Sequence, residues 1–171
     1  MYQAIISPHL DYCSSILFLL NSNQINAMQK IVNKAMRSIL RADKYTSIRK
    51  MCKALSWLNV KERIILNTMS LIFKIYKGLV PNYLCKNIKL NSDVHEHNTR
   101  YKNNVYRENV KSKFIENSIY VKGSRIFNRI PEKIRKNSDY KVFRSECCEL
   151  IKEHKLIALK GETLTFWNII N

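Results

Sequence analysis

The chain has 171 residues, 46% of them hydrophobic, with only three glycines and three prolines. This length and apolar content suffice for a buried core and exclude wholesale disorder, and so few helix breakers argue against a turn-rich β-sandwich. Thirty Lys and Arg against thirteen Asp and Glu give a net charge of +17. Such an excess predicts a polyanionic partner, most commonly nucleic acid, otherwise an anionic membrane surface or the acidic part of a larger protein. We therefore expect a basic, all-α protein.

The cysteines and the apolar runs indicate the compartment. An odd number of scattered cysteines without a C-x₂-C pair is typical of free thiols in a reducing environment. The most apolar run, residues 16–20, is too short to cross a bilayer, and no secretory signal is evident. We expect a cytoplasmic or nuclear protein with no membrane partner. The cysteines are Cys13, Cys52, Cys85, Cys147 and Cys148.

Residues 1–90 are predicted to form a small helical bundle. Residues 4–20 are apolar enough for a buried helix, with Pro8 in its first turn or kinking it. Asn23 is the expected N-cap of a second helix that runs to about Leu40. This helix has one apolar stripe, and its basic residues lie on the other faces. The stripe recurs at spacings of three and four: Ile25, Met28, Ile31, Val32, Ala35, Met36 and Ile39.

Three further helices complete the first region. Thr46 or Ser47 is expected to cap a short one, and a longer one is predicted over residues 60–77. Gly78 stands where a left-handed residue ends a helix, and Pro81 stands at the first position of the next helix, which reaches residue 88.

The second half differs in character. Residues 91–117 are rich in Asn, Lys, Arg, His and Ser, which predicts a long polar, basic loop of the kind that often binds a ligand and marks a subdomain boundary. Residues 118–156 are predicted to be helical again, with helices over 118–130 and from Pro131 through Lys136. Ser138 or Asp139 is the expected cap of a last helix over 140–156. The tail, 157–171, is apolar but poorly patterned.

Residues for catalysis are scarce. A polymerase or nuclease needs carboxylates that converge on Mg²⁺, and the acidic residues here are dispersed, with no adjacent pair of aspartates. His95 and His97, with Glu96 between them, are a conceivable metal pair, but no spaced cysteine pair completes the site. Cys85 and His95 are close in sequence yet lack a nucleophile signature. We therefore expect no enzymatic activity, metal or other cofactor in this chain.

The remaining pattern combines cations with aromatic rings. Lys and Arg bind phosphates, and rings such as Tyr101, Tyr106 and Tyr120 stack on bases. The alternative for each residue is a solvated surface cation or a core aromatic. The predicted nucleic-acid-binding residues are Lys30, Lys34, Arg37, Arg100, Lys102, Arg107, Lys111, Arg125 and Arg129.

Several strings, in this order, resemble the region downstream of the polymerase active site in reverse transcriptases of jockey-like non-LTR retrotransposons. They cover residues 2 to about 150, and the last has Phe127 where the family usually has Trp. The strings are Pro8-His-Leu-Asp-Tyr-Cys13, Met28-Gln-Lys-Ile-Val-Asn-Lys-Ala-Met-Arg-Ser-Ile39, Leu55-Ser-Trp-Leu-Asn-Val60 with Tyr76-Lys-Gly-Leu-Val-Pro81, His97-Asn-Thr-Arg100, and Gly123-x-x-x-Phe-Asn-x-x-Pro-x-x-Ile134.

The resemblance implies a thumb-like helical subdomain over 1–90 and a C-terminal helical region over 118–156. In such an enzyme the thumb holds the template–primer duplex by its backbone, and catalysis uses Mg²⁺-binding aspartates of a palm that this chain does not contain. The expected partners are RNA or DNA, bound without sequence specificity, and the palm and fingers of the parent polymerase. A protein-interaction module, or a decayed element without activity, is the alternative.

Other residues of these strings are expected to be structural. His9 and Tyr12 are expected to pack in the core, and Asn98 and Thr99 to fix their loop through side-chain hydrogen bonds to the backbone. The full set is Pro8, His9, Tyr12, Gln29, His97, Asn98, Thr99, Gly123, Asn128 and Pro131.

Overall fold

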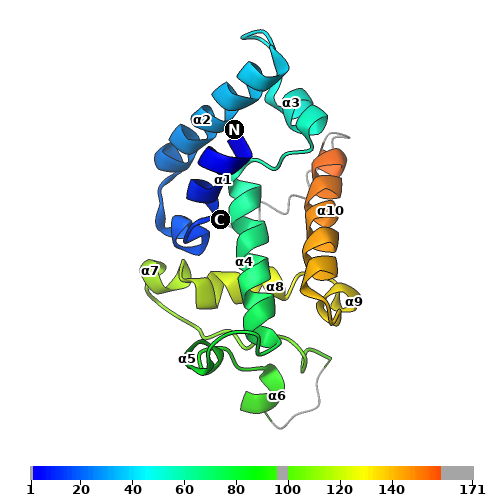
Figure 1. Ribbon diagram of the computed structural model, residues 1–171. Coiled ribbons are helices and arrows are strands. Elements are labelled where there is room, and N and C mark those ends of the chain that lie inside the picture. Colours follow the sequence, from blue (N-terminus) through cyan, green and yellow to red (C-terminus); the bar gives the residue numbers. More distant parts are fainter. Residues whose placement is uncertain (1, 96–99, 159–171) are drawn as a thin grey trace. The chain divides into compact units, whose positions relative to one another are not determined.

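The computed structural model describes residues 2–95 and 100–158, and most of these residues are helical (Figure 1). The described part of the chain contains no strand, only an isolated antiparallel bridge between Leu90 and Val105. The all-α prediction is therefore confirmed. Contacts group the chain into two compact units, Met1–Asn67 and Thr68–Asn171, whereas the sequence suggested a division after residue 90.

The first unit is built from short helices and the beginning of α4. A residue in the left-handed conformation, Cys13 with φ 49°, separates α1 from the 3₁₀ helix η1. The single helix expected over 4–20 is thus two, and Pro8 lies inside the first of them. The elements are α1 (Tyr2–Asp11), η1 (Ser14–Leu19), α2 (Ser22–Leu40), α3 (Ile48–Leu55) and the start of α4 (Val60–Tyr76).

The N-cap of α2 lies two residues before the predicted cap at Asn23. Asn21 is the N-cap: its Oδ1 accepts from Gln24 N at 2.9 Å, and Gln24 Oε1 accepts from Asn21 N at 3.0 Å. This reciprocal pair satisfies two backbone donors that a helix start otherwise leaves without partners. The prediction was wrong because Asn21 and Asn23, separated by one serine, are both suitable cap residues. Only Asn21 is followed three residues later by a Gln, which completes the reciprocal pair.

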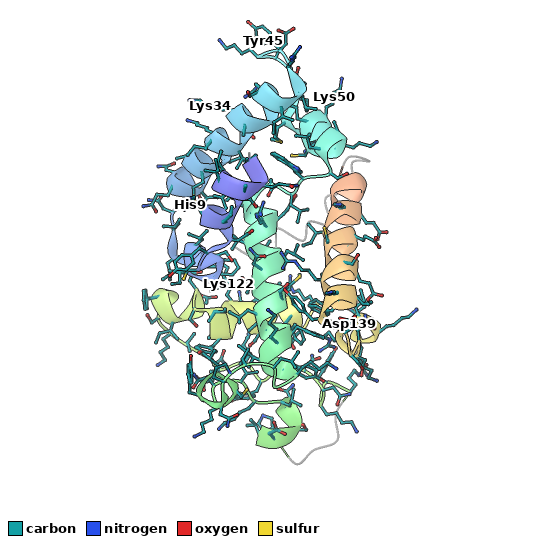
Figure 2. The ribbon with its side chains drawn as sticks, in the orientation of Figure 1. His9, Lys34, Tyr45, Lys50, Lys122 and Asp139 are labelled. Atoms are coloured by element: carbon teal, nitrogen blue, oxygen red, sulfur yellow. The ribbon has the colours of Figure 1, made fainter. Side chains whose placement is uncertain are left out.

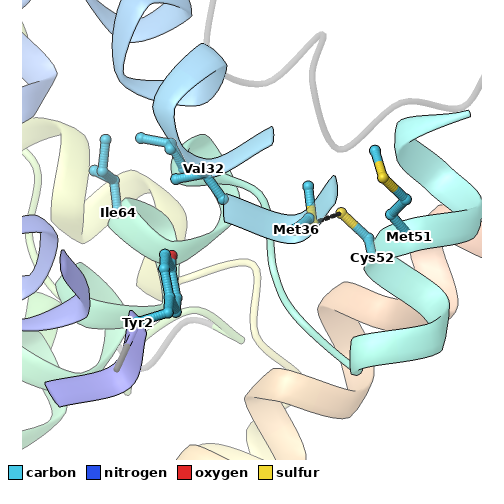
Figure 3. Close-up of a cluster of buried hydrophobic side chains, with 7 residues drawn as sticks. Tyr2, Val32, Met36, Met51, Cys52 and Ile64 are labelled. Atoms are coloured by element: carbon cyan, nitrogen blue, oxygen red, sulfur yellow. Dashed lines mark hydrogen bonds between the residues drawn. The ribbon is translucent and has the colours of Figure 1, made fainter. Parts of the chain in front are cut away.

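A small apolar core holds the first unit together (Figure 3). Tyr2 stacks on Trp57 with ring centroids 3.9 Å apart, and the Cys52 thiol lies 3.8 Å from Met36 Sδ. Part of the predicted apolar stripe of α2 does not reach this core: Ile31 is 56% exposed and Ile39 50%. The core residues are Tyr2, Val32, Met36, Met51, Cys52, Val60 and Ile64.

Polar side chains fix the start of α4 within this unit. Asn59 and Glu62 form a second reciprocal cap, with both bonds 2.9 Å long. Gln29 of α2 accepts from Val60 N at 2.8 Å and donates to Asn33 Oδ1 at 2.8 Å, so it ties α2 to a helix end whose backbone donors need partners.

The second tie in this unit is ionic. The Arg63 guanidinium lies 2.5 and 2.6 Å from the two carboxylate oxygens of Asp11, and Asn67 donates to the same carboxylate at 2.8 Å. The hydrogen bond to Asp11 raises the pKa of Arg63 above its usual value. A two-pronged pair of this kind fixes orientation as well as distance, so it locks α1 against α4.

The second unit continues α4 and adds shorter helices. Gly78, at φ 68°, ends α4 as predicted: Leu79 N donates to Lys74 O at 2.8 Å, and Gly78 N to Ile75 O at 3.0 Å. The other elements are α5 (Asn82–Cys85), α6 (Asn91–Val94), α7 (Lys113–Glu116), η2 (Ile119–Gly123), α8 (Ser124–Phe127), α9 (Glu132–Arg135) and α10 (Tyr140–Ala158).

An aromatic cluster forms the core of the second unit. Phe73 of α4 and Phe143 of α10 stack with centroids 4.0 Å apart, and Phe127 lies 6.2 Å from Phe143. Asp139 caps α10, since its Oδ1 accepts from Lys141 N at 2.8 Å, in line with one of the two predicted caps. The helices α10 and α4 therefore lie beside each other in this unit (Figure 1).

Candidate nucleic-acid interface

The predicted cations of α2 share one face of the helix. Lys30, Lys34 and Arg37 are spaced by four and three residues, which places them within an arc of about 60° over a length of about 10 Å. Lys30 and Lys34 are exposed, while Arg37 is half-buried. The stripe is thus a row of positive charges on a helix whose other face is anchored by Val32 and Met36.

The positive charge continues through the turn after α2 and into α3, which the sequence reading did not include. All the cations between residues 41 and 53 are exposed. Tyr45, in the turn, is 92% exposed, and Figure 2 labels it at the turn between α2 and α3, with Lys34 and Lys50 on the two helices. From 30 to 53 there are eight cations, Lys30, Lys34, Arg37, Arg41, Lys44, Arg49, Lys50 and Lys53, against one acid, Asp43.

This basic α2–α3 segment is held in place by backbone and core contacts. Arg41 adopts φ 48° and ends α2, with Ala42 N donating to Arg37 O at 3.0 Å. Thr46 N donates to Asp43 O at 3.0 Å across the turn. Because the inner faces of both helices are packed in the first core, the backbone that carries the outer cations is already ordered, and only their side chains lose freedom when they bind.

A second basic surface lies on the loop of the second unit. Arg100, Lys102, Arg107 and Lys111 are exposed there. The loop is tied down at both sides of Val105: Asn91 N donates to Asn104 O at 2.9 Å, and Tyr106 N to Lys89 O at 2.8 Å.

Asn128 completes the attachment of this loop. Its Oδ1 accepts from Val105 N and its Nδ2 donates to Val105 O, both at 2.8 Å. The amide therefore takes the place of a neighbouring strand for one residue of extended chain. A segment that is polar in sequence is thus given a defined conformation by side-chain amides.

Three of the predicted cations lie close together: Arg107 in this loop, and Arg125 and Arg129 in the segment that follows it. Partial burial, together with the charges of Arg125 and Arg107, lowers the pKa of Arg129 below its usual value, as expected for like charges held close. Burial and the charge of Arg125 lower the pKa of Lys122 as well. Arg125 itself is engaged by Glu116 at 3.0 Å. Arg107 and Arg129 are therefore the more available of the three.

Eight of the ten residues predicted to be structural fall into three groups. Gln29, Asn128 and Pro131 make hydrogen bonds that hold backbone segments in place. The carbonyl oxygen of Pro131 accepts from Ile134 N at 3.0 Å at the start of α9. The prediction for His9 and Tyr12 was wrong: His9 is exposed and Tyr12 is 80% exposed, because α1 turns Tyr2 and Ser7 toward the core instead. His97, Asn98 and Thr99 lie outside the described residues, as does Glu96.

Gly123 has a packing role in the second unit. A Cβ at this position would lie 3.1 Å from two side-chain carbons of Ile72 and 3.2 Å from Thr68 Cγ2. Its φ is negative, −63°, so the backbone conformation does not require glycine. What requires it is the close approach of η2 to α4, which leaves no room for a side chain.

The residues considered for catalysis have separate surroundings. The Cys85 thiol lies 3.6 Å from Val80 O, and the His95 ring packs edge-on against Tyr106 at 5.8 Å. Within residues 2–95 and 100–158, no three His, Cys, Asp or Glu side chains gather as a metal site would need. No helix in the same ranges is long and apolar enough to cross a membrane.

Both basic surfaces present exposed Lys and Arg side chains to solvent. Exposed Lys and Arg side chains reach phosphate oxygens without fixing a sequence. In comparison with known proteins, no family model matches the chain, and neither a curated protein nor a solved structure matches it.

Proposed function

We propose that this protein binds the backbone of RNA or DNA without sequence specificity, chiefly through the basic α2–α3 segment. The observation that carries the proposal is the charge of that segment, eight cations against one acid, on two helices whose opposite faces are fixed in a core. By the resemblance of its sequence, we further propose that the chain is a thumb-like module of a non-LTR reverse transcriptase, with no catalytic residue of its own.

Binding of this kind has a characteristic salt dependence. Each phosphate neutralised by Lys or Arg releases condensed counterions, so the logarithm of the affinity falls by about 0.9 per contact on duplex and about 0.7 on single strands for each decade of salt. A segment that engages four to six phosphates therefore has a slope of roughly −4 to −5 on duplex.

The test is fluorescence anisotropy with labelled RNA–DNA duplex and single strands across a salt series. Replacing Lys30, Lys34 and Lys50 by Gln should weaken duplex binding on the order of tenfold at low salt and reduce the magnitude of the slope by about 3. The matched control removes the same charge from three exposed cations outside α2 and α3, Lys86, Lys133 and Lys141. It should have a clearly smaller effect. Absence of binding by the unaltered protein at low salt would end the proposal.

A second function, docking on another protein, is favoured by a different observation. Ile5, Ile16 and Leu19, on α1 and η1, are large apolar side chains exposed to solvent, and exposed apolar patches mark interaction surfaces. Light scattering distinguishes this function. Self-association that is abolished by Ile16→Ser with Leu19→Ser, while nucleic-acid binding is unchanged, would support it, whereas a monomer at all concentrations would count against it.

The relation to reverse transcriptases has its own test. Sequencing the genomic DNA that flanks the coding region would reveal whether a reading frame for a palm with its metal-binding aspartates adjoins it. Such a frame would support the proposed parentage. An unrelated neighbouring frame would contradict it without bearing on nucleic-acid binding.

A further inference from the structure

We infer that Tyr45 and the cations around it form a stacking site for an unpaired base, so that the α2–α3 turn selects single-stranded nucleic acid. This inference rests on the proposed function and deepens it. The basic stripe of α2 accounts for backbone binding of any strand, but it does not account for an aromatic ring placed at the end of the same segment.

The position of the ring is the first argument. Tyr45 is 92% exposed, more than any other large apolar side chain of the described residues. Within that part of the chain it has neither a ring contact nor a side-chain hydrogen bond. Both flat faces of the ring are therefore open to a partner, and nothing in the first unit uses the side chain to stabilise the fold.

The fixed shape of the turn is the second argument. The hydrogen bonds from Ala42 N to Arg37 O and from Thr46 N to Asp43 O set the path of the chain on both sides of Tyr45. Ala42 also packs against the first core. A ring carried on a fixed turn loses less freedom on binding than one on a loose loop.

The neighbouring charges are the third argument. Within five residues on either side of Tyr45 stand Arg41, Lys44, Arg49 and Lys50, with Asp43 as the only acid. A ring among cations is the usual composition of a single-strand site, where the base stacks and the adjacent phosphates are neutralised. In a duplex the bases are stacked on each other, so a protruding ring finds no free face except at an end or a bulge.

The polar character of the turn favours nucleic acid over a lipid surface. Asp43, Thr46 and Ser47 flank the ring, whereas segments that insert into membranes present several apolar side chains together. An acidic peptide would be bound by the cations alone and would gain nothing specific from the ring. The partner of this turn is therefore a single-stranded nucleic acid.

The experiment compares two changes, one in the protein and one in the ligand. Anisotropy is measured for the unaltered chain, Tyr45→Ala and Tyr45→Phe with a short labelled oligo-dT strand, an abasic strand of equal length, and a blunt duplex. Stacking contributes enough per base that Tyr45→Ala should weaken oligo-dT binding by about fivefold or more. The effect on the abasic strand and on the duplex should stay below about twofold, since neither offers an unpaired base.

Two controls keep the result specific. Tyr45→Phe keeps the ring and should bind oligo-dT within about twofold of the unaltered chain. Tyr12→Ala removes a ring that is also largely exposed, at 80%, but has no Lys or Arg near it in sequence, and should leave all affinities unchanged. Because both tyrosines are exposed, circular dichroism should report the same helical content for every variant.

The outcomes separate this inference from the proposed function. If the unaltered chain binds no nucleic acid, both are overturned. If it binds all strands and Tyr45→Ala binds them equally well, or loses the same factor on oligo-dT and on the abasic strand, only the stacking site is overturned. If Tyr45→Ala weakens binding to phosphatidylserine vesicles and not to oligo-dT, the turn is a membrane contact and the inference is wrong.

Discussion

Replacing Asn128 by Ala should destabilise the second unit more than the loss of an ordinary hydrogen bond. Val105 is 2% exposed. It lies opposite Leu90 in an antiparallel bridge, but the two residues do not hydrogen-bond to each other. The bonds of the bridge are made by their neighbours, from Tyr106 N to Lys89 O and from Asn91 N to Asn104 O. The N–H and C=O of Val105 therefore point away from residue 90, toward Asn128, which meets both at 2.8 Å.

The magnitude follows from the burial of these two groups. Removing the amide leaves a buried donor and a buried acceptor without partners, and each costs about 1–2 kcal/mol when water reaches it only in part. We expect Asn128→Ala to lower the free energy of unfolding by about 2–4 kcal/mol, a large share of the 5–15 kcal/mol typical of a domain. The matched control is Asn103→Ala, which removes one exposed hydrogen bond, to Glu132 Oε1 at 3.1 Å, and should cost about 0.5 kcal/mol or less.

The assay combines urea unfolding, followed by circular dichroism, with amide hydrogen exchange at Val105. In the unaltered protein the Val105 amide should be protected, and in Asn128→Ala it should exchange faster even under conditions where the helices are intact. A change below about 0.5 kcal/mol with unaltered exchange at Val105 would refute the reasoning, because it would mean that these backbone groups do not depend on Asn128.

Three other changes test single features. Ser56 ends α3 at φ 53°, so Ser56→Gly should relieve this strain and raise the free energy of unfolding by about 1 kcal/mol; a lower melting temperature would contradict this. Gly123→Ala should lower the stability by about 1–3 kcal/mol, because the new Cβ would lie 3.1 Å from fully buried Ile72; unchanged urea unfolding would refute the packing argument. Burial raises the pKa of the Cys147 thiol to about 12, so iodoacetamide at mildly alkaline pH should modify exposed Cys13 and spare Cys147, as read by mass spectrometry. The unfolded chain loses this proton at lower pH than the folded one, so the thiol's contribution to stability should fall as the pH rises from about 9 toward 12.

The helical architecture could be predicted because local signals determine it. Spacings of three and four residues indicate amphipathic helices, and Gly78 was correctly placed as a helix end since a left-handed residue there favours glycine. The breaks at Cys13, Arg41 and Ser56, at φ 49°, 48° and 53°, could not be predicted in this way. None of them is a glycine, so the composition gives no sign of their conformation.

Burial was harder to predict than helicity. Periodicity indicates the direction of an apolar face but not its width, and the first core covers only part of α2, so Ile31 and Ile39 stay half exposed. The same limit explains the wrong expectation for Tyr12. The size of the core is a property of the whole unit, which no short window of sequence contains.

The candidate interface was predicted in part for a related reason. The sequence pattern indicated residues 100–129, where several aromatic rings stand among the cations, and the regular stripe of α2. It did not include the turn after α2, where four cations stand around a single aromatic residue, Tyr45. That segment becomes a single basic surface only when α2 and α3 fold back on each other. An exposed aromatic in a basic turn was the signal that could have revealed it.

In the loop around Val105, the residues that fix the backbone are not the residues that carry the charge. Its path depends on uncharged groups, the side chains of Asn91 and Asn128 and the backbone near Val105, while its cations, Arg100, Lys102 and Arg107, project into solvent. Substitutions that change the number or spacing of these cations can therefore accumulate without unfolding the loop. Sequence drift can change the charge of this surface while its frame stays constant.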